Sequence, residues 1–124
     1  GLSDRSRLTA TDLARGLAGA RRVALLRPLL RAFELRDAQG RVLRNHPVQV
    51  QAKTGTLYFV STLAGYIRTP GGKDLAFAIF TASDSLRARI DPQADARPPG
   101  ARSWNRRAKT LQQALIERWS AVYG

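Results

Sequence analysis

The residues best suited to chemistry form the run KTGT at positions 53–56, inside the segment VQVQAKTGTLYFV. An ammonium group and two hydroxyls can bind anionic oxygens, and a glycine lets a second backbone approach closely. The run continues a strand that alternates strictly: residues 48, 50 and 52 are apolar, and Lys53 shares the opposite face with Gln49 and Gln51. We therefore expect a polar row on a sheet. The alternative interpretation is a solvated lysine followed by a β-bulge at the Thr-Gly pair.

Three antiparallel strands are predicted to hold this run, over residues 48–54, 57–69 and 73–83. The Pro-Gly-Gly sequence at 70–72 predicts a tight connection between the second and third strands. The third strand is apolar on both faces from 75 to 80, which favours a central position in the sheet.

Helices are predicted on either side of these strands. Thr9 and Asp12 are placed as an N-cap and its partner for a helix that ends near Gly19. Residues 23–33 predict a short helix or two half-helices, because Pro28 interrupts the segment. Asp37 to Gly40 predict a turn in a hairpin or extended loop. A long helix is predicted from 101 to 124 on a stripe of apolar side chains: Trp104, Ala108, Leu111, Leu115, Trp119 and Val122. The fold class is α+β, a single unit over residues 1–124.

Composition limits the possible functions. The chain has no cysteine, which excludes disulfides and thiolate sites. It has no apolar stretch of the roughly 20 residues that a transmembrane helix needs. With 21 Lys+Arg against 9 Asp+Glu the net charge is +12. Such a charge indicates either an anionic partner or the arginine bias of a GC-rich genome.

The motif in its setting resembles a known family. The strings AKTGTL, LAGYI and FAIFTA on successive strands, with the opening GLSDRSRLTATDLARGL, are similar to the C-terminal part of the D-alanyl-D-alanine carboxypeptidases/endopeptidases. These are low-molecular-mass penicillin-binding proteins with a serine β-lactamase-like transpeptidase fold. The resemblance covers nearly the whole chain and is weakest from Phe33 to Pro47. It implies three antiparallel strands covered by helices, including the long C-terminal one.

The resemblance also implies a role for each motif residue. Lys53 would attract the terminal carboxylate of a peptidyl-D-Ala-D-Ala substrate and help hold a proton network. Thr54 and Thr56 would donate hydroxyl hydrogen bonds to that carboxylate. Gly55 would let the substrate lie along the strand. The backbone N–H of Thr56 would form half of the oxyanion hole.

Two other family motifs are absent from these 124 residues. No serine is followed by lysine three positions later, as S-x-x-K requires, and the one S-x-N string, Ser103–Asn105, stands after the KTG motif. We interpret it as the start of the terminal helix. His46 is the single histidine and is expected in a loop. We therefore expect a C-terminal fragment that forms one wall of an active site and cannot form an acyl-enzyme alone.

These inferences define the expected partners. They are peptidoglycan stem peptides and β-lactams, the N-terminal portion of the same enzyme, and a second copy paired through strand 74–82. The expected location is the periplasm, with no metal or other cofactor. The alternative is a basic nucleic-acid-binding module, and the wide spread of arginines disfavours it: Arg5, Arg36, Arg68, Arg89 and Arg107.

Overall fold

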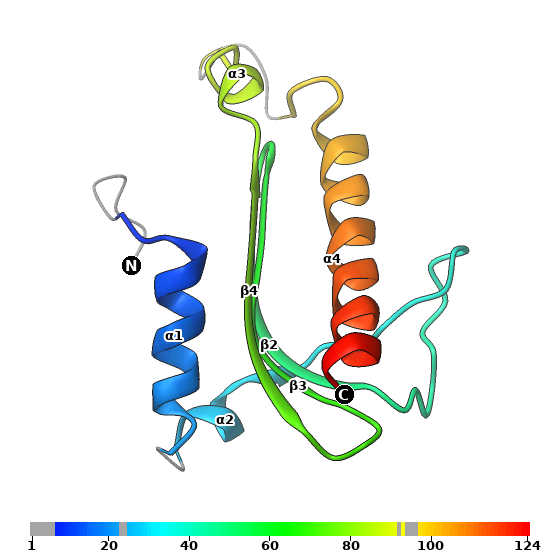
Figure 1. Ribbon diagram of the computed structural model, residues 1–124. Coiled ribbons are helices and arrows are strands. Elements are labelled where there is room, and N and C mark those ends of the chain that lie inside the picture. The colour runs from blue at the N-terminus through cyan, green and yellow to red at the C-terminus, as the bar shows by residue number, and fades with distance from the viewer. Residues whose placement is uncertain (1–6, 23–24, 92, 94–96) are drawn as a thin grey trace.

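A curved antiparallel sheet with a helix on each face forms the centre of the protein (Figure 1). The computed structural model describes residues 7–22, 25–91, 93 and 97–124. The sheet order is β1-β2-β3-β4, with bounds β1 Arg31–Ala32, β2 Gln49–Leu57, β3 Val60–Arg68 and β4 Asp74–Ala82. The helices are α1 Ala10–Ala20, α2 Leu26–Leu29, α3 Asp84–Arg87 and α4 Ala101–Tyr123. The predicted α+β class is confirmed, with four strands where three were expected.

Helix α1 begins as its capping residues predict. The Thr9 hydroxyl accepts the Asp12 N–H at 3.0 Å and donates to the Asp12 carboxylate at 2.6 Å. The helix lies against β4 and β3 (Figure 1). There the buried Tyr66 hydroxyl donates to the Leu17 carbonyl at 2.7 Å. The opening Gly-Leu-Ser segment and Arg5 lie outside the described residues.

Helix α4 covers the opposite face of the sheet, and the main core lies beneath it. Leu63, Ile67 and Ile116 are fully buried there. The predicted apolar stripe is only partly right, because Leu111 and Val122 are about half exposed. The buried positions of α4 are Ala101, Ala108, Gln112, Ile116 and Ser120, and only Ala108 among them belongs to the predicted stripe. Gln112 is tolerated in this position because its amide donates to the buried Ser61 hydroxyl at 3.0 Å.

The β2–β3 turn corrects the predicted strand boundaries. Leu57 ends β2 and pairs with Val60, so Tyr58 and Phe59 form a two-residue turn inside what was predicted as one strand over 57–69. Phe59 has φ +58°, which is rare for a bulky residue. It is 4% exposed and contacts Trp104 edge-on at 6.2 Å between ring centroids. Burial of this ring stabilises a turn that has no glycine or asparagine at its central positions.

Strand β4 lies at an edge of the sheet in the described residues, not in its centre as its apolar sequence predicted. Its two apolar faces have another cause. Phe77 points to the α4 side, where its ring is 6.4 Å from that of Trp119, and α1 covers the other side. The strand pattern predicts that Phe77 and Phe80 are both core residues; Phe77 is buried, but Phe80 is 40% exposed, so the prediction is wrong for Phe80.

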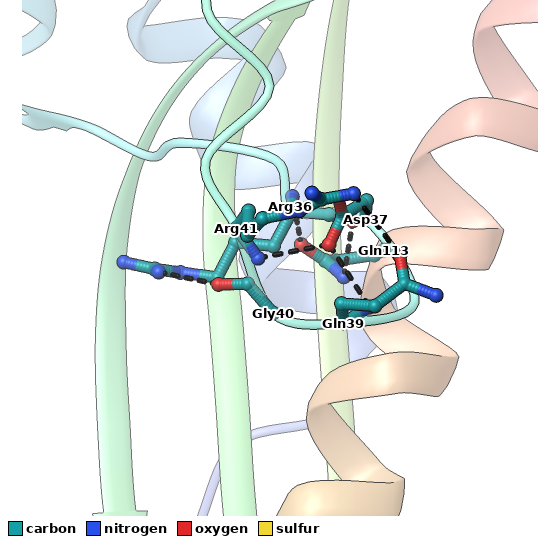
Figure 2. A network of polar contacts seen from close by, with 6 residues as sticks. All are labelled: Arg36, Asp37, Gln39, Gly40, Arg41 and Gln113. Atoms are coloured by element: carbon teal, nitrogen blue, oxygen red, sulfur yellow. Dashed lines mark hydrogen bonds and ion pairs between the residues drawn. The ribbon is translucent and has the colours of Figure 1, made fainter.

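A small hairpin follows β1 and contacts the middle of α4 (Figure 2). An Arg36–Val42 bridge closes it, and Asp37 directs its turn as predicted. The backbone N–H of Arg41 donates to the Asp37 carboxylate, and this hydrogen bond lowers the pKa of Asp37 below its ordinary 3.8. The Gln113 side chain accepts the Arg36 N–H at 2.8 Å, which fixes the hairpin against α4.

Candidate active-site edge

The KTGT run lies in regular strand β2, which excludes the bulge interpretation. The β2–β3 register continues without a skipped residue from Gln49↔Arg68 to Leu57↔Val60. Lys53 is exposed on the face that it shares with the half-buried Gln51, as the alternation predicted. Val50 and Ala52 lie on the other face, in the core beneath α4.

The backbone of the run is open on its outer side. The Phe33 N–H donates to the Val50 carbonyl at 2.9 Å, so residue 50 directs its polar backbone groups away from β3. In antiparallel pairing this direction alternates, and Thr54 and Thr56 therefore also point their N–H and C=O groups outward. Strand β1 pairs only with Gln51 and Ala52. Within the described residues no strand continues along 53–57, which leaves an edge available to an extended peptide.

Groups from the two opposite faces of the sheet meet at this outer edge. The Lys53 side chain lies on the α1 side of the sheet, while the Thr54 and Thr56 side chains lie on the α4 side and line a cleft there. The Lys53 Nζ turns to the outer edge and donates to the Thr54 carbonyl at 2.6 Å. An ammonium and the outward N–H of Thr56 thus flank the same edge. Such an arrangement can bind a carboxylate and stabilise an oxyanion.

Two glycines allow this part of the sheet to form. A Cβ at Gly55 would collide with the Thr62 hydroxyl, which donates to the Gly55 carbonyl at 3.4 Å. A Cβ at Gly65 would lie 2.7 Å from the Cα of Ala52, directly before the motif. The sequence reasoning missed the contributions of Thr62 and Gly65. The AKTGTL and LAGYI strings include both glycines, but they do not show which atoms of the neighbouring strand lie against each glycine.

The remaining candidates form their hydrogen bonds with residues outside the KTGT run. The Ser103 hydroxyl donates to the Gly100 carbonyl in the first turn of α4, and the Asn105 amide donates to the Leu57 carbonyl. The S-x-N string is therefore a helix start, as predicted. The His46 ring accepts the Val48 N–H at 3.2 Å in the loop before β2. In the part of the chain that the structure describes, no three His, Asp or Glu residues group as metal ligands.

Comparison with known families places the chain in one of them. The family model of the D-Ala-D-Ala carboxypeptidase 3 (S13) family matches residues 1–97. The chain belongs to this family. The match includes the KTGT run and all four strands, and α4 lies beyond it. Neither a curated protein nor a solved structure matches the chain.

Membership of the S13 family supports a D-Ala-D-Ala carboxypeptidase function. It also indicates peptidoglycan as the substrate. The resemblance derived from the sequence is thus confirmed at the level of the family. No helix among the described residues is both long and apolar enough to cross a membrane.

Proposed function

We propose that the chain forms the KTG wall of a serine-type D-Ala-D-Ala carboxypeptidase/endopeptidase that cleaves peptidoglycan stem peptides through an acyl-enzyme. Lys53, Thr54 and Thr56 bind the terminal carboxylate of the substrate, and the Thr56 N–H supplies one donor of the oxyanion hole. Gly55 leaves room for the substrate backbone. The nucleophilic serine and its base come from residues outside these 124, and the enzyme works in the cell envelope, where β-lactams acylate it.

The open outer edge of residues 53–57 carries this proposal. A peptide that pairs there would meet the outward N–H of Thr56, with the Lys53 ammonium at the same edge. One preorganised oxyanion donor is worth about 3–4 kcal/mol in the transition state. The family match supports the reaction class.

Labelling with a fluorescent penicillin tests the proposal. In the enzyme that contains this chain together with the serine, Lys53→Ala should reduce labelling strongly. The matched control is Lys73→Ala, because Lys73 lies in the β3–β4 turn and its ammonium donates to the Gly124 carbonyl. The isolated 124-residue chain should not be labelled by the fluorescent penicillin. Equal labelling of the Lys53→Ala variant and the unchanged enzyme would contradict the assignment.

The nucleic-acid alternative predicts binding that weakens steeply as salt rises. In the described residues the arginines named above lie in separate elements: Arg36 in the hairpin, Arg68 in β3, Arg89 after α3 and Arg107 in α4. This distribution favours the peptidase. Tight, sequence-independent oligonucleotide binding at moderate salt would favour the alternative.

A further inference from the structure

A cleft of about 890 Å³ lies on the α4 side of the sheet, between the end of the β2–β3 hairpin, the 33–40 hairpin and the first half of α4. Its volume is typical of sites for small molecules and short peptides. Thr54 and Thr56 form part of its lining, so the cleft begins where the open edge of β2 lies. Gln113 holds the opposite wall in place through its contacts with Arg36 (Figure 2).

The charge of this cleft is strongly unbalanced. Arg102, Arg106 and Lys109 of α4 line it, and Arg36 of the hairpin also belongs to the lining, with its guanidinium donating to the Gly40 carbonyl at 2.8 Å. The α4 cations follow an i, i+4, i+7 spacing, which places them on one side of the helix over about 10 Å. We call the site formed by these four cations with Thr54 and Thr56 the α4 basic cleft.

The described residues do not neutralise these cations. The ion pairs among the described residues are formed by Arg27, Arg41 and Arg68, and none includes a cation of the α4 basic cleft. Two carboxylates also line the cleft, those of Glu34 and Asp37, and the Asp37 carboxylate is already hydrogen-bonded to the Arg41 side chain. Like charges gathered in a concave site repel each other, and an anionic ligand removes that repulsion.

The position of the cations on α4 gives an independent argument. The first turn of the helix contains Arg102 and no acidic residue, and Gly100 caps it without a side-chain hydrogen bond. The positive end of the helix dipole disfavours arginine there. Helix stability therefore does not explain this arrangement, whereas recognition of an anion does.

The open edge of β2 identifies the class of ligand. A peptide paired with that edge presents alternate side chains to the two faces of the sheet, and one set points to the α4 side. Carboxylates on that set would meet arginines, which bind them through two parallel hydrogen bonds. A nucleic acid has no backbone donors that match the edge.

We propose that the α4 basic cleft binds side-chain carboxylates of an acidic peptide whose D-Ala-D-Ala terminus lies at the Lys53–Thr56 edge. This inference rests on the proposed function and adds selectivity for acidic residues upstream of the cleaved bond. Arg106 and Lys109 determine that selectivity, and Lys53 binds the terminus.

The test compares two synthetic peptides, acetyl-Glu-Glu-Lys(acetyl)-D-Ala-D-Ala and its Gln-Gln counterpart, by calorimetric titration of the protein. The acidic peptide should bind at least about tenfold more tightly, as one charge-assisted hydrogen bond predicts. The double variant Arg106→Gln/Lys109→Gln should abolish this preference and leave the affinity for the Gln-Gln peptide unchanged. The control Arg107→Gln, on the same helix but outside the cleft lining, should keep the preference.

The outcomes separate the two proposals. Equal affinities for the two peptides, including no measurable binding of either, overturn the α4 basic cleft as an acidic-peptide site. Loss of both affinities in Lys53→Ala supports the proposed function. If Lys53→Ala keeps both affinities and the preference for the acidic peptide, the result supports the α4 basic cleft and counts against the proposed function. An oligonucleotide that binds more tightly than the acidic peptide, and depends on Arg106 and Lys109, overturns the peptide assignment.

Discussion

Replacement of Gly65 by alanine tests how closely β3 must approach the strand that carries the motif. The added Cβ would lie 2.7 Å from the Cα of Ala52 and 3.0 Å from its Cβ, and it would also collide with the Gln51 carbonyl. Two of these three atoms belong to the backbone of β2, which is paired with β1 on one side and β3 on the other at these residues. The collision can therefore be relieved only by a shift of β2.

The magnitude follows from this geometry. Overpacking a well-packed site costs about 1–3 kcal/mol, and we expect about 3 kcal/mol because a paired strand yields less than the tip of a side chain. Gly16→Ala is the matched control, since its Cβ would meet nothing within 4 Å and it lies inside α1. Alanine there should stabilise the helix by about 0.5–1 kcal/mol. The two glycine variants should thus differ by roughly 4 kcal/mol.

Urea unfolding followed by tryptophan fluorescence measures this difference. Trp104 and Trp119 are both partly buried against phenylalanines of the sheet region, so their emission reports loss of the α4 packing. Midpoints compared at a common denaturant slope give the change in free energy of unfolding. A Gly65→Ala midpoint equal to that of the unchanged protein would refute the steric argument.

Three further predictions concern the edges and the hairpin. Thr56→Pro removes an outward N–H without breaking a β2–β3 hydrogen bond, so penicillin acylation should fall about 10²–10³-fold in a folded enzyme; undiminished acylation would argue against the oxyanion role. Asp37 should titrate below 3.8 in a carboxyl NMR titration because the Arg41 N–H stabilises its charged form. The stabilisation that the ionised Asp37 carboxylate gives the hairpin is then complete above pH 3.8 and is lost as the pH falls through the lower folded pKa. A titration midpoint of Asp37 at or above 3.8 would exclude this stabilisation. Two copies should pair through the outer edge of β4 at 74–82, giving a dimer by light scattering that Ala78→Pro dissociates; a monomer with this edge open would count against the pairing.

Local patterns predicted much of the fold. The alternation of residues 48–53 gave the correct face for Lys53, and the cap formed by Thr9 and Asp12 gave the start of α1. Both succeed because period and capping depend on neighbours in the chain. The α4 stripe was partly wrong because Gln112 is buried through a hydrogen bond to Ser61, a partner that its own helix does not contain.

The candidate site divides in the same way. The sequence by itself determined the family and the residue types at 53–56, since these depend only on the order of the residues. Only the tertiary structure decided that the pairing of β1 with β2 reaches no further than Ala52, that the outer edge of Thr54 and Thr56 is open, and that α4 places its cations beside them. The physical reason is that pairing, close approach at Gly65 and unbalanced charge arise between segments far apart in the chain, where no local periodicity records them.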